Sequence, residues 1–201
     1  MSQIPQLSNG LALEHGISMF VDHGKGSGSK MSVGGQANAD TSVGTAVTGT
    51  VTETELTEYA IPANALVAGS TIRMRAAVLT TAENGTDTLQ TILRLGANTT
   101  ASSNESVFAN TAIDQEVNDI TVWDVIVQVR SVGASGASIA FGTITNNDAG
   151  PVAAGGSLKA SFTLDTTVIN YLSLTATWGS GSEDNSCRSE AFVVDIVNPS
   201  T

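Results

Sequence analysis

The chain has 201 residues, of which 41% are hydrophobic, only 4% aromatic and only 13% charged, and its formal net charge is −11. So acidic a chain repels phosphate backbones and anionic lipid headgroups, which excludes nucleic-acid binding and electrostatic attachment to membranes. Its single cysteine, Cys187, excludes an internal disulfide, and the many small and β-branched residues predict β-structure.

The first segment of the chain, residues 1–52, is predicted to be an extended N-terminal arm. Gly, Ser, Thr and Ala dominate its composition, as in linkers, and strand-like alternation begins only near residue 52. Within the arm, Val43, Val47 and Val51 are expected to share one face of a strand. The opening residues lack the basic and apolar regions of a secretory signal, and no apolar run approaches the roughly 20 residues that span a bilayer. We therefore expect synthesis in a cytoplasm without export.

Residues 22–35, DHGKGSGSKMSVGG, raise the question of a phosphate-binding loop. A Walker A loop has a Lys preceded by Gly and followed by Ser or Thr, between a strand and a helix. Here Lys30 follows Ser29 and precedes Met31, and the glycines also lack the G-x-G-x-x-G spacing of a dinucleotide site. We interpret this stretch as a linker within the arm and expect no cofactor.

From residue 53 onwards, apolar and polar residues alternate with a period of two, which indicates strands with one buried face. In the clearest strand, 120–130, Trp123, Val125, Val127 and Val129 would face a core. Turn-forming clusters separate the predicted strands, which are 53–61, 70–79, 87–96, 106–113, 120–130, 137–145, 158–165, 171–178 and 189–197. We predict that residues 53–201 form an all-β domain, an antiparallel β-sandwich or jelly roll of about eight or nine strands.

Few residues suggest catalysis or metal binding. His15 and His23 both lie in the arm, each next to an acidic residue, Glu14 and Asp22. Sequence spacing alone does not make a metal site, which usually needs three or more ligands, so we interpret the histidines as solvated or interface residues. Cys187 lies far from both histidines in sequence and so lacks a base to activate it. We expect it to begin the last strand as a small, partly buried residue.

The acidic residues are interpreted as solvated side chains. Nothing in the sequence marks the substrate cleft of a glycoside hydrolase, although its carboxylate pair could come from three groups: Glu53, Glu55 and Glu58; Asp114, Glu116 and Asp119; or Glu183 and Asp184. The acidic loops 179–185 and 146–148 leave a Ca²⁺ site open, because carboxylate and amide oxygens are the ligands of that ion.

One part of the sequence resembles a known family. The run YAIPANALVAGSTIRMRAAVLTTAENGTDTLQTILRLGANT (59–99) resembles a jelly-roll domain of tailed-phage virion proteins, in which an "IPA…L…G" turn leads into a strand of the "tIRvrA" type and a later strand ends in "RLG". Residues 122–136 resemble the Trp-bearing strand of that domain, and 176–197 its last hairpin. The resemblance covers about residues 53–198 and carries no catalytic residues. It implies a place on the virion surface, assembly as a trimer and attachment through terminal segments.

We therefore expect a structural protein and not an enzyme, namely a capsid decoration (cement) protein on the virion exterior. Its partners would be the major capsid protein and copies of itself as a homotrimer. The alternative is a head fibre, a tail fibre or a receptor-binding module, because the same fold serves all of these. Attachment is expected through apolar and basic side chains of the arm: Leu11, Leu13, Ile17, Met19, Phe20, Lys25 and Lys30.

Overall fold

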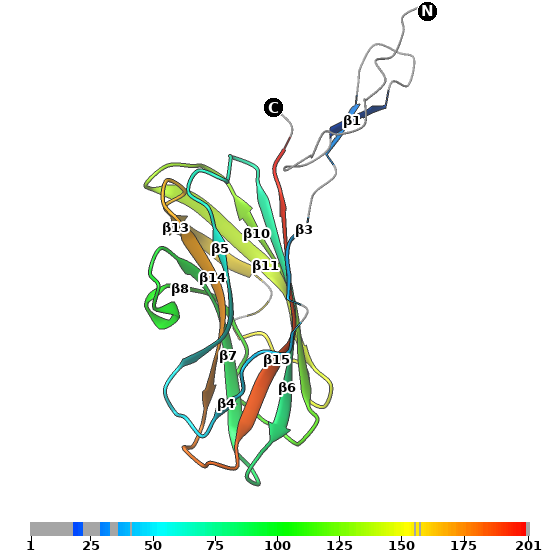
Figure 1. Cartoon of the computed structure of the whole chain (residues 1–201), viewed down its shortest axis with the longest axis vertical. Helices are drawn as coiled ribbons and strands as arrows, with labels where there is room; N and C mark the ends of the chain where they lie inside the picture. The colour runs from blue at the N-terminus through cyan, green and yellow to red at the C-terminus, as the bar shows by residue number, and fades with distance from the viewer. Residues whose placement is uncertain are drawn as a thin grey trace, which may run out of the picture.

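The chain folds into two antiparallel β-sheets packed face to face, and the computed structural model shows them as two layers (Figure 1). The structure describes residues 18–21, 29–32, 36–40, 42–154, 156 and 158–199, and of the first three ranges only the backbone. The predicted all-β sandwich is confirmed. The described residues contain one short 3-10 helix, Ala101–Ser103, and no helix that could cross a membrane.

Each sheet gathers strands from distant parts of the sequence. The eight-stranded sheet contains β3 (Gln36–Asp40), β4 (Val47–Thr48), β6 (Thr71–Ala82), β10 (Ile120–Val129), β11 (Gly136–Asn146), β12 (Gly150–Pro151), β13 (Leu158–Leu164) and β15 (Ser186–Val197). The five-stranded sheet contains β5 (Thr54–Ile61), β7 (Thr88–Gly96), β8 (Glu105–Ala109), β9 (Ile113–Asp114) and β14 (Asn170–Trp178). A separate two-stranded sheet pairs β1 (Ser18–Val21) with β2 (Ser29–Ser32).

The pairing of the central strands links the two layers. The connections from β6 to β7 and from β14 to β15 each pass from one sheet to the other. β6 pairs with β15 in the eight-stranded sheet, and β7 pairs with β14 in the five-stranded sheet. The segment β6–β7 therefore runs beside the segment β14–β15 in both sheets, although the two segments come from opposite halves of the sequence.

The core lies between the sheets and consists of the residues whose alternation predicts an inward face. Trp123, Val125, Val127 and Val129 on β10 are each at most 1% exposed. Burying an aliphatic side chain of this size contributes about 1.5–3 kcal/mol, so the alternating pattern fixes which face of each strand points inward. Other confirmed inward residues are Ile72, Met74, Ala76, Val78, Leu89, Leu93, Leu95, Leu172, Leu174, Ala176 and Trp178.

The prediction that Val43, Val47 and Val51 of the arm share one face of a strand is wrong. Val47 is 4% exposed and lies in the two-residue β4, but Val43 and Val51 are 53% and 61% exposed. Gly49 has a φ of +52°, a left-handed conformation that turns the chain between Val47 and Val51. The strand therefore ends before its alternation can place all three valines on one side.

Part of the predicted arm belongs to the eight-stranded sheet. β3 pairs with residues 192–195 of β15, and β4 pairs with the first two residues of β15. The division of the chain at residue 52 stays a prediction. The hydrogen bonding adds that β3 and β4 both pair antiparallel with β15.

Candidate functional site

The residues predicted to attach the arm to a partner lie only partly within the described structure. Met19 and Phe20 lie in β1, and Lys30 lies in β2 at the register position opposite Phe20. The structure thus brings three of the predicted residues into one small sheet, and their attachment role stays a prediction. The remaining predicted residues lie outside the described part of the chain: Leu11, Leu13, Ile17 and Lys25.

The chain joins the sandwich along β15. Gln36, the first residue of β3, pairs with Asp195 near the end of β15, and Val47 pairs with Cys187 near its start. Between these positions, the backbone N–H of Gly44 donates to the carbonyl oxygen of Ser189 at 2.8 Å. The chain therefore enters β3 at the end of the sandwich where β15 finishes.

The two ends of the sandwich differ in charge. At the end where β15 finishes, the connections 62–70, 97–104, 130–135 and 165–169 carry one base, Arg130, and one acid, Asp165. We call this the neutral end. At the opposite end, every charged residue in the connections 49–53, 83–87, 147–149 and 179–185, and in residues 110–119 around the short β9, is acidic: Glu53, Glu83, Asp87, Asp114, Glu116, Asp119, Asp148, Glu183 and Asp184. We call this the acidic end, and the chain enters β3 on the side away from it.

Asn185 ties the loops of the acidic end together. Its carbonyl oxygen accepts a hydrogen bond from the N–H of Gly49 at 3.0 Å, and its Oδ1 accepts one from the N–H of Asn84 at 3.0 Å. Its Nδ2 donates to Oδ2 of Asp87 at 2.8 Å, and Ser180 Oγ donates to the same oxygen at 2.6 Å. These hydrogen bonds from Ser180 and Asn185 lower the pKa of Asp87, so its negative charge is retained at this end.

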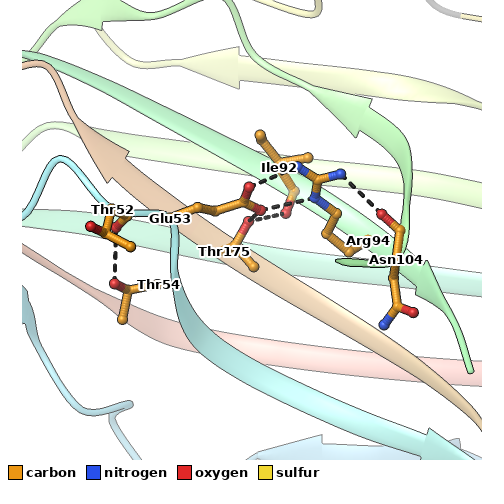
Figure 2. Close-up of polar contacts among 7 residues, drawn as sticks. All are labelled: Thr52, Glu53, Thr54, Ile92, Arg94, Asn104 and Thr175. Carbon is orange, nitrogen blue, oxygen red and sulfur yellow. Dashed lines mark hydrogen bonds and ion pairs between the residues drawn. The ribbon is translucent and has the colours of Figure 1, made fainter. Parts of the chain in front are cut away.

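The outer face of the five-stranded sheet carries an enclosed ion pair (Figure 2). Arg94 on β7 donates from Nε to Glu53 Oε1 at 2.9 Å and from Nη2 to Glu53 Oε2 at 2.7 Å. Thr175 on β14 donates to the same carboxylate at 2.6 Å, and Arg94 Nη1 donates to the carbonyl oxygen of Asn104 at 3.0 Å. Only 16% of the Arg94 side chain and 17% of the Glu53 side chain are exposed.

The interpretation of Glu53 as a solvated side chain is therefore wrong. Burial raises its pKa, but the hydrogen bonds from Arg94 and Thr175 and the charge of Arg94 together outweigh burial and lower it below 4.5. A carboxyl group held ionised in this way is a poor proton donor. Its geometry fits a clamp between β7, β14 and the start of β5.

Two further carboxyl groups lie beside this clamp. A β-bulge shifts the pairing of β5 with β14, so that Glu58 lies opposite Ser173 while Glu55 lies opposite Thr175. Ser173 Oγ donates to Glu58 Oε2 at 3.1 Å. Burial, the charge of Glu58 and a hydrogen bond to Glu58 all raise the pKa of Glu55. On this outer face, Glu53 is thus stabilised by Arg94, whereas the neighbouring carboxylates of Glu55 and Glu58 repel each other.

The outer face of the eight-stranded sheet combines arginines with apolar side chains. Arg73 donates from Nε and Nη2 to the two carboxylate oxygens of Asp124, at 3.1 Å and 2.7 Å. Arg75 Nε lies 3.6 Å from Asp124 Oδ2, and 57% of the Arg75 side chain is exposed. Apolar neighbours on the same face include Val122, 49% exposed, and Phe141, 39% exposed. The pairing of β10 with β6 and β11 places these residues on one continuous surface.

Cys187 begins the last strand, as predicted, but it is fully buried instead of partly buried. Burial raises the pKa of its thiol to about 12, so the nucleophilic thiolate is not formed at neutral pH. His15 and His23 lie outside the described residues. Among the residues that the structure does describe, no three His, Cys, Asp or Glu side chains gather closely enough to hold a metal ion.

Comparisons of the chain with protein-family models, with curated proteins and with solved structures found no match.

Proposed function

We propose that the chain is a structural protein of a phage virion, a capsid decoration protein that binds the outer capsid surface through its N-terminal arm and stabilises the shell. Its partners are the major capsid protein and copies of itself, assembled as a trimer on the capsid exterior. The proposal assigns no catalytic activity and no cofactor to the chain. It draws on the resemblance of residues 53–198 to jelly-roll domains of tailed-phage virion proteins.

The observation that carries the proposal is the placement of the arm relative to the charge of the sandwich. The chain enters β3 at Gln36, beside Asp195, at the neutral end, and the acidic loops lie at the opposite end. A neutral end can approach another protein surface without electrostatic repulsion, while a strongly acidic end favours solvent and repels neighbouring particles. This arrangement suits a protein that stands on a shell with its acidic loops outward.

The arm offers two means of attachment. An extended segment can add a strand to an exposed sheet edge, and its apolar side chains can fill pockets of the partner. Several arms on one oligomer would raise the apparent affinity, because the second arm binds intramolecularly.

Binding to shells that lack the decoration protein tests this proposal. The full chain should co-sediment with such shells and raise their thermal stability, whereas a variant lacking residues 1–35 should do neither. The deletion stops at residue 35 because β3, β4 and the buried Val47 belong to the sandwich. A Glu183→Gln, Asp184→Asn variant at the acidic end is the control and should bind as the full chain does. Undiminished binding by the folded deletion variant would overturn the proposal.

A receptor-binding module is a second candidate. Exposed apolar side chains in the loops of the neutral end favour it, because Val132, Val168 and Ile169 are 48%, 39% and 47% exposed. A receptor-binding protein would adsorb to host cells as an isolated chain, and a Val168→Lys, Ile169→Lys variant would lose this adsorption. A decoration protein would bind shells and leave cells uncoated.

A further inference from the structure

The outer face of the eight-stranded sheet has a composition unlike the rest of this acidic protein. Across the sheet, Phe141 on β11 lies opposite Ile126 on β10, and Ile126 lies opposite Arg73 on β6. One row further along, Asp124 lies opposite Arg75, which in turn lies opposite Val193 on β15. Each of these neighbouring rows thus combines apolar and charged positions on one surface.

This surface has two hollows, and each is lined by one of the two arginines. One hollow is lined by Ile126, Phe141 and Val197 together with Arg73 and Asp195. The other is lined by Val122, Ala77, Ala191 and Val193 together with Arg75 and Asp124. Each hollow therefore combines apolar side chains with one arginine and one aspartate, and Thr71 and Gln128 also line the first. Arginine and aromatic residues such as Phe141 are enriched at protein–protein interfaces.

We propose that this face is the contact surface between copies of the chain. Its charges make it complementary to itself, because Arg73 and Arg75 share the surface with Asp124 and Asp195, and so each sign on one copy can meet the opposite sign on another. Within the described residues, the Arg75 guanidinium has one carboxylate contact, at 3.6 Å, and so keeps donors for a partner.

The size of the face suits a stable contact. Five neighbouring strands spaced about 4.8 Å apart and about ten residues long cover roughly 800 Å², which is about the area that each partner buries in a standard interface. Each partially exposed apolar side chain that becomes covered adds to the free energy of association. At the acidic end, an approaching copy would meet further carboxylates and would be repelled. The two exposed arginines reduce this repulsion on the proposed face.

The inference goes beyond the proposed function, since it names the surface through which copies meet, and it does not require binding to a capsid. The full chain at micromolar concentration should have the mass of two or more copies in light scattering coupled to size-exclusion chromatography. Val122→Lys and Phe141→Lys should each reduce the mass to that of one chain, or raise the dissociation constant at least tenfold. Arg75→Glu should do the same through charge alone.

Val168→Lys is the matched control, because Val168 and Phe141 are equally exposed, at 39%, but Val168 lies in a loop outside this face. It should leave the mass unchanged. Circular dichroism must show a folded sandwich for each variant. If Val122→Lys or Phe141→Lys unfolds the protein, Arg75→Glu still tests the contact, because it changes only a solvent-exposed side chain. A wild-type chain that stays monomeric, or folded face variants that keep the oligomeric mass, would overturn the inference. A monomer that still binds shells would overturn this inference and the trimer of the proposed function, and would leave attachment through the arm standing.

Discussion

Arg94 and Glu53 form the most enclosed ion pair among the residues that the structure describes, with two parallel hydrogen bonds of 2.9 Å and 2.7 Å. The pair joins β7 to the segment that precedes β5, and the hydroxyl of Thr175 on β14 completes it. Three neighbouring strands of the five-stranded sheet are therefore held at one point on their outer face (Figure 2). This geometry allows the contribution of the pair to be tested separately from the core.

Replacing Arg94 with Met should destabilise the sandwich by about 2 kcal/mol, because it leaves the partly buried Glu53 carboxylate without its charged partner. Chemical denaturation of the variant and the wild type measures this difference. Arg188→Met is the matched control, since Arg188 and Glu190 form an ion pair with 38% and 32% side-chain exposure. The control should change stability by less than about 0.5 kcal/mol. Equal effects of the two replacements would contradict the clamp.

The Glu53 clamp should also make stability fall in acid. The folded protein lowers the pKa of Glu53 below 4.5, so this contribution is present above pH 4.5 and is lost as pH falls through the folded-state pKa. Glu53→Gln removes the titrating group, so the difference in unfolding temperature between wild type and variant should shrink towards pH 3. A difference that stays constant from pH 7 to pH 3 would show that the charge of Glu53 is not what stabilises the clamp.

The neighbouring pair, Glu55 and Glu58, should have the opposite effect on the pH dependence of stability. The folded protein raises the pKa of Glu55 through burial and through Glu58, so ionising Glu55 costs stability as pH rises through its folded-state pKa. Glu55→Gln should therefore raise the unfolding temperature at pH 7 by about 1–2 °C and have no effect at pH 3. The expected gain is small because Glu55 is only partly buried, and the solvent in contact with the rest of its side chain screens its charge. A loss of stability at pH 7 would contradict the assigned repulsion.

The folded chain should protect Cys187 from thiol reagents. Its side chain is fully buried and its pKa is raised to about 12, so a disulfide reagent at pH 8 should modify it only as fast as the protein unfolds. Labelling should rise to one thiol per chain in denaturant. Rapid labelling of the folded protein at pH 8 would show that β15 opens at its start, where it pairs with β4.

Alternation along the strands was sufficient to predict much of the sandwich. The pattern around Trp123 correctly predicted both the strand and its buried face, because a single inward face fixes the side of every second residue. The pairing of β15 with β3 and β4 was not predictable, because β3 contains few apolar residues and its partner lies more than a hundred residues away in sequence. The clamp was missed for a related reason. Glu53 meets Arg94 only through a side-by-side arrangement of strands that local pattern does not encode.

The pairing of β3 and β4 with β15 predicts how two deletions in the arm affect stability. Deleting residues 1–35 should leave the unfolding temperature unchanged, because every strand of the two main sheets remains. Deleting residues 1–50 removes β3, β4 and the side chain of Val47, which is 4% exposed, and should cost at least about 2 kcal/mol. Thermal unfolding of the two truncated chains distinguishes them. Equal stability would mean that the edge of β15 does not require its partners.

In the proposed attachment, the neutral end of the sandwich faces the shell and the acidic end faces solvent. Electron cryo-microscopy of shells carrying the full chain measures this orientation directly, once the sandwich is fitted into the density of the decoration. We predict that Gln36 and the start of β3 lie nearest the capsid surface and that the loop with Glu183 and Asp184 lies outermost. Density with the loop 179–185 against the shell, or shells that remain bare, would contradict the account.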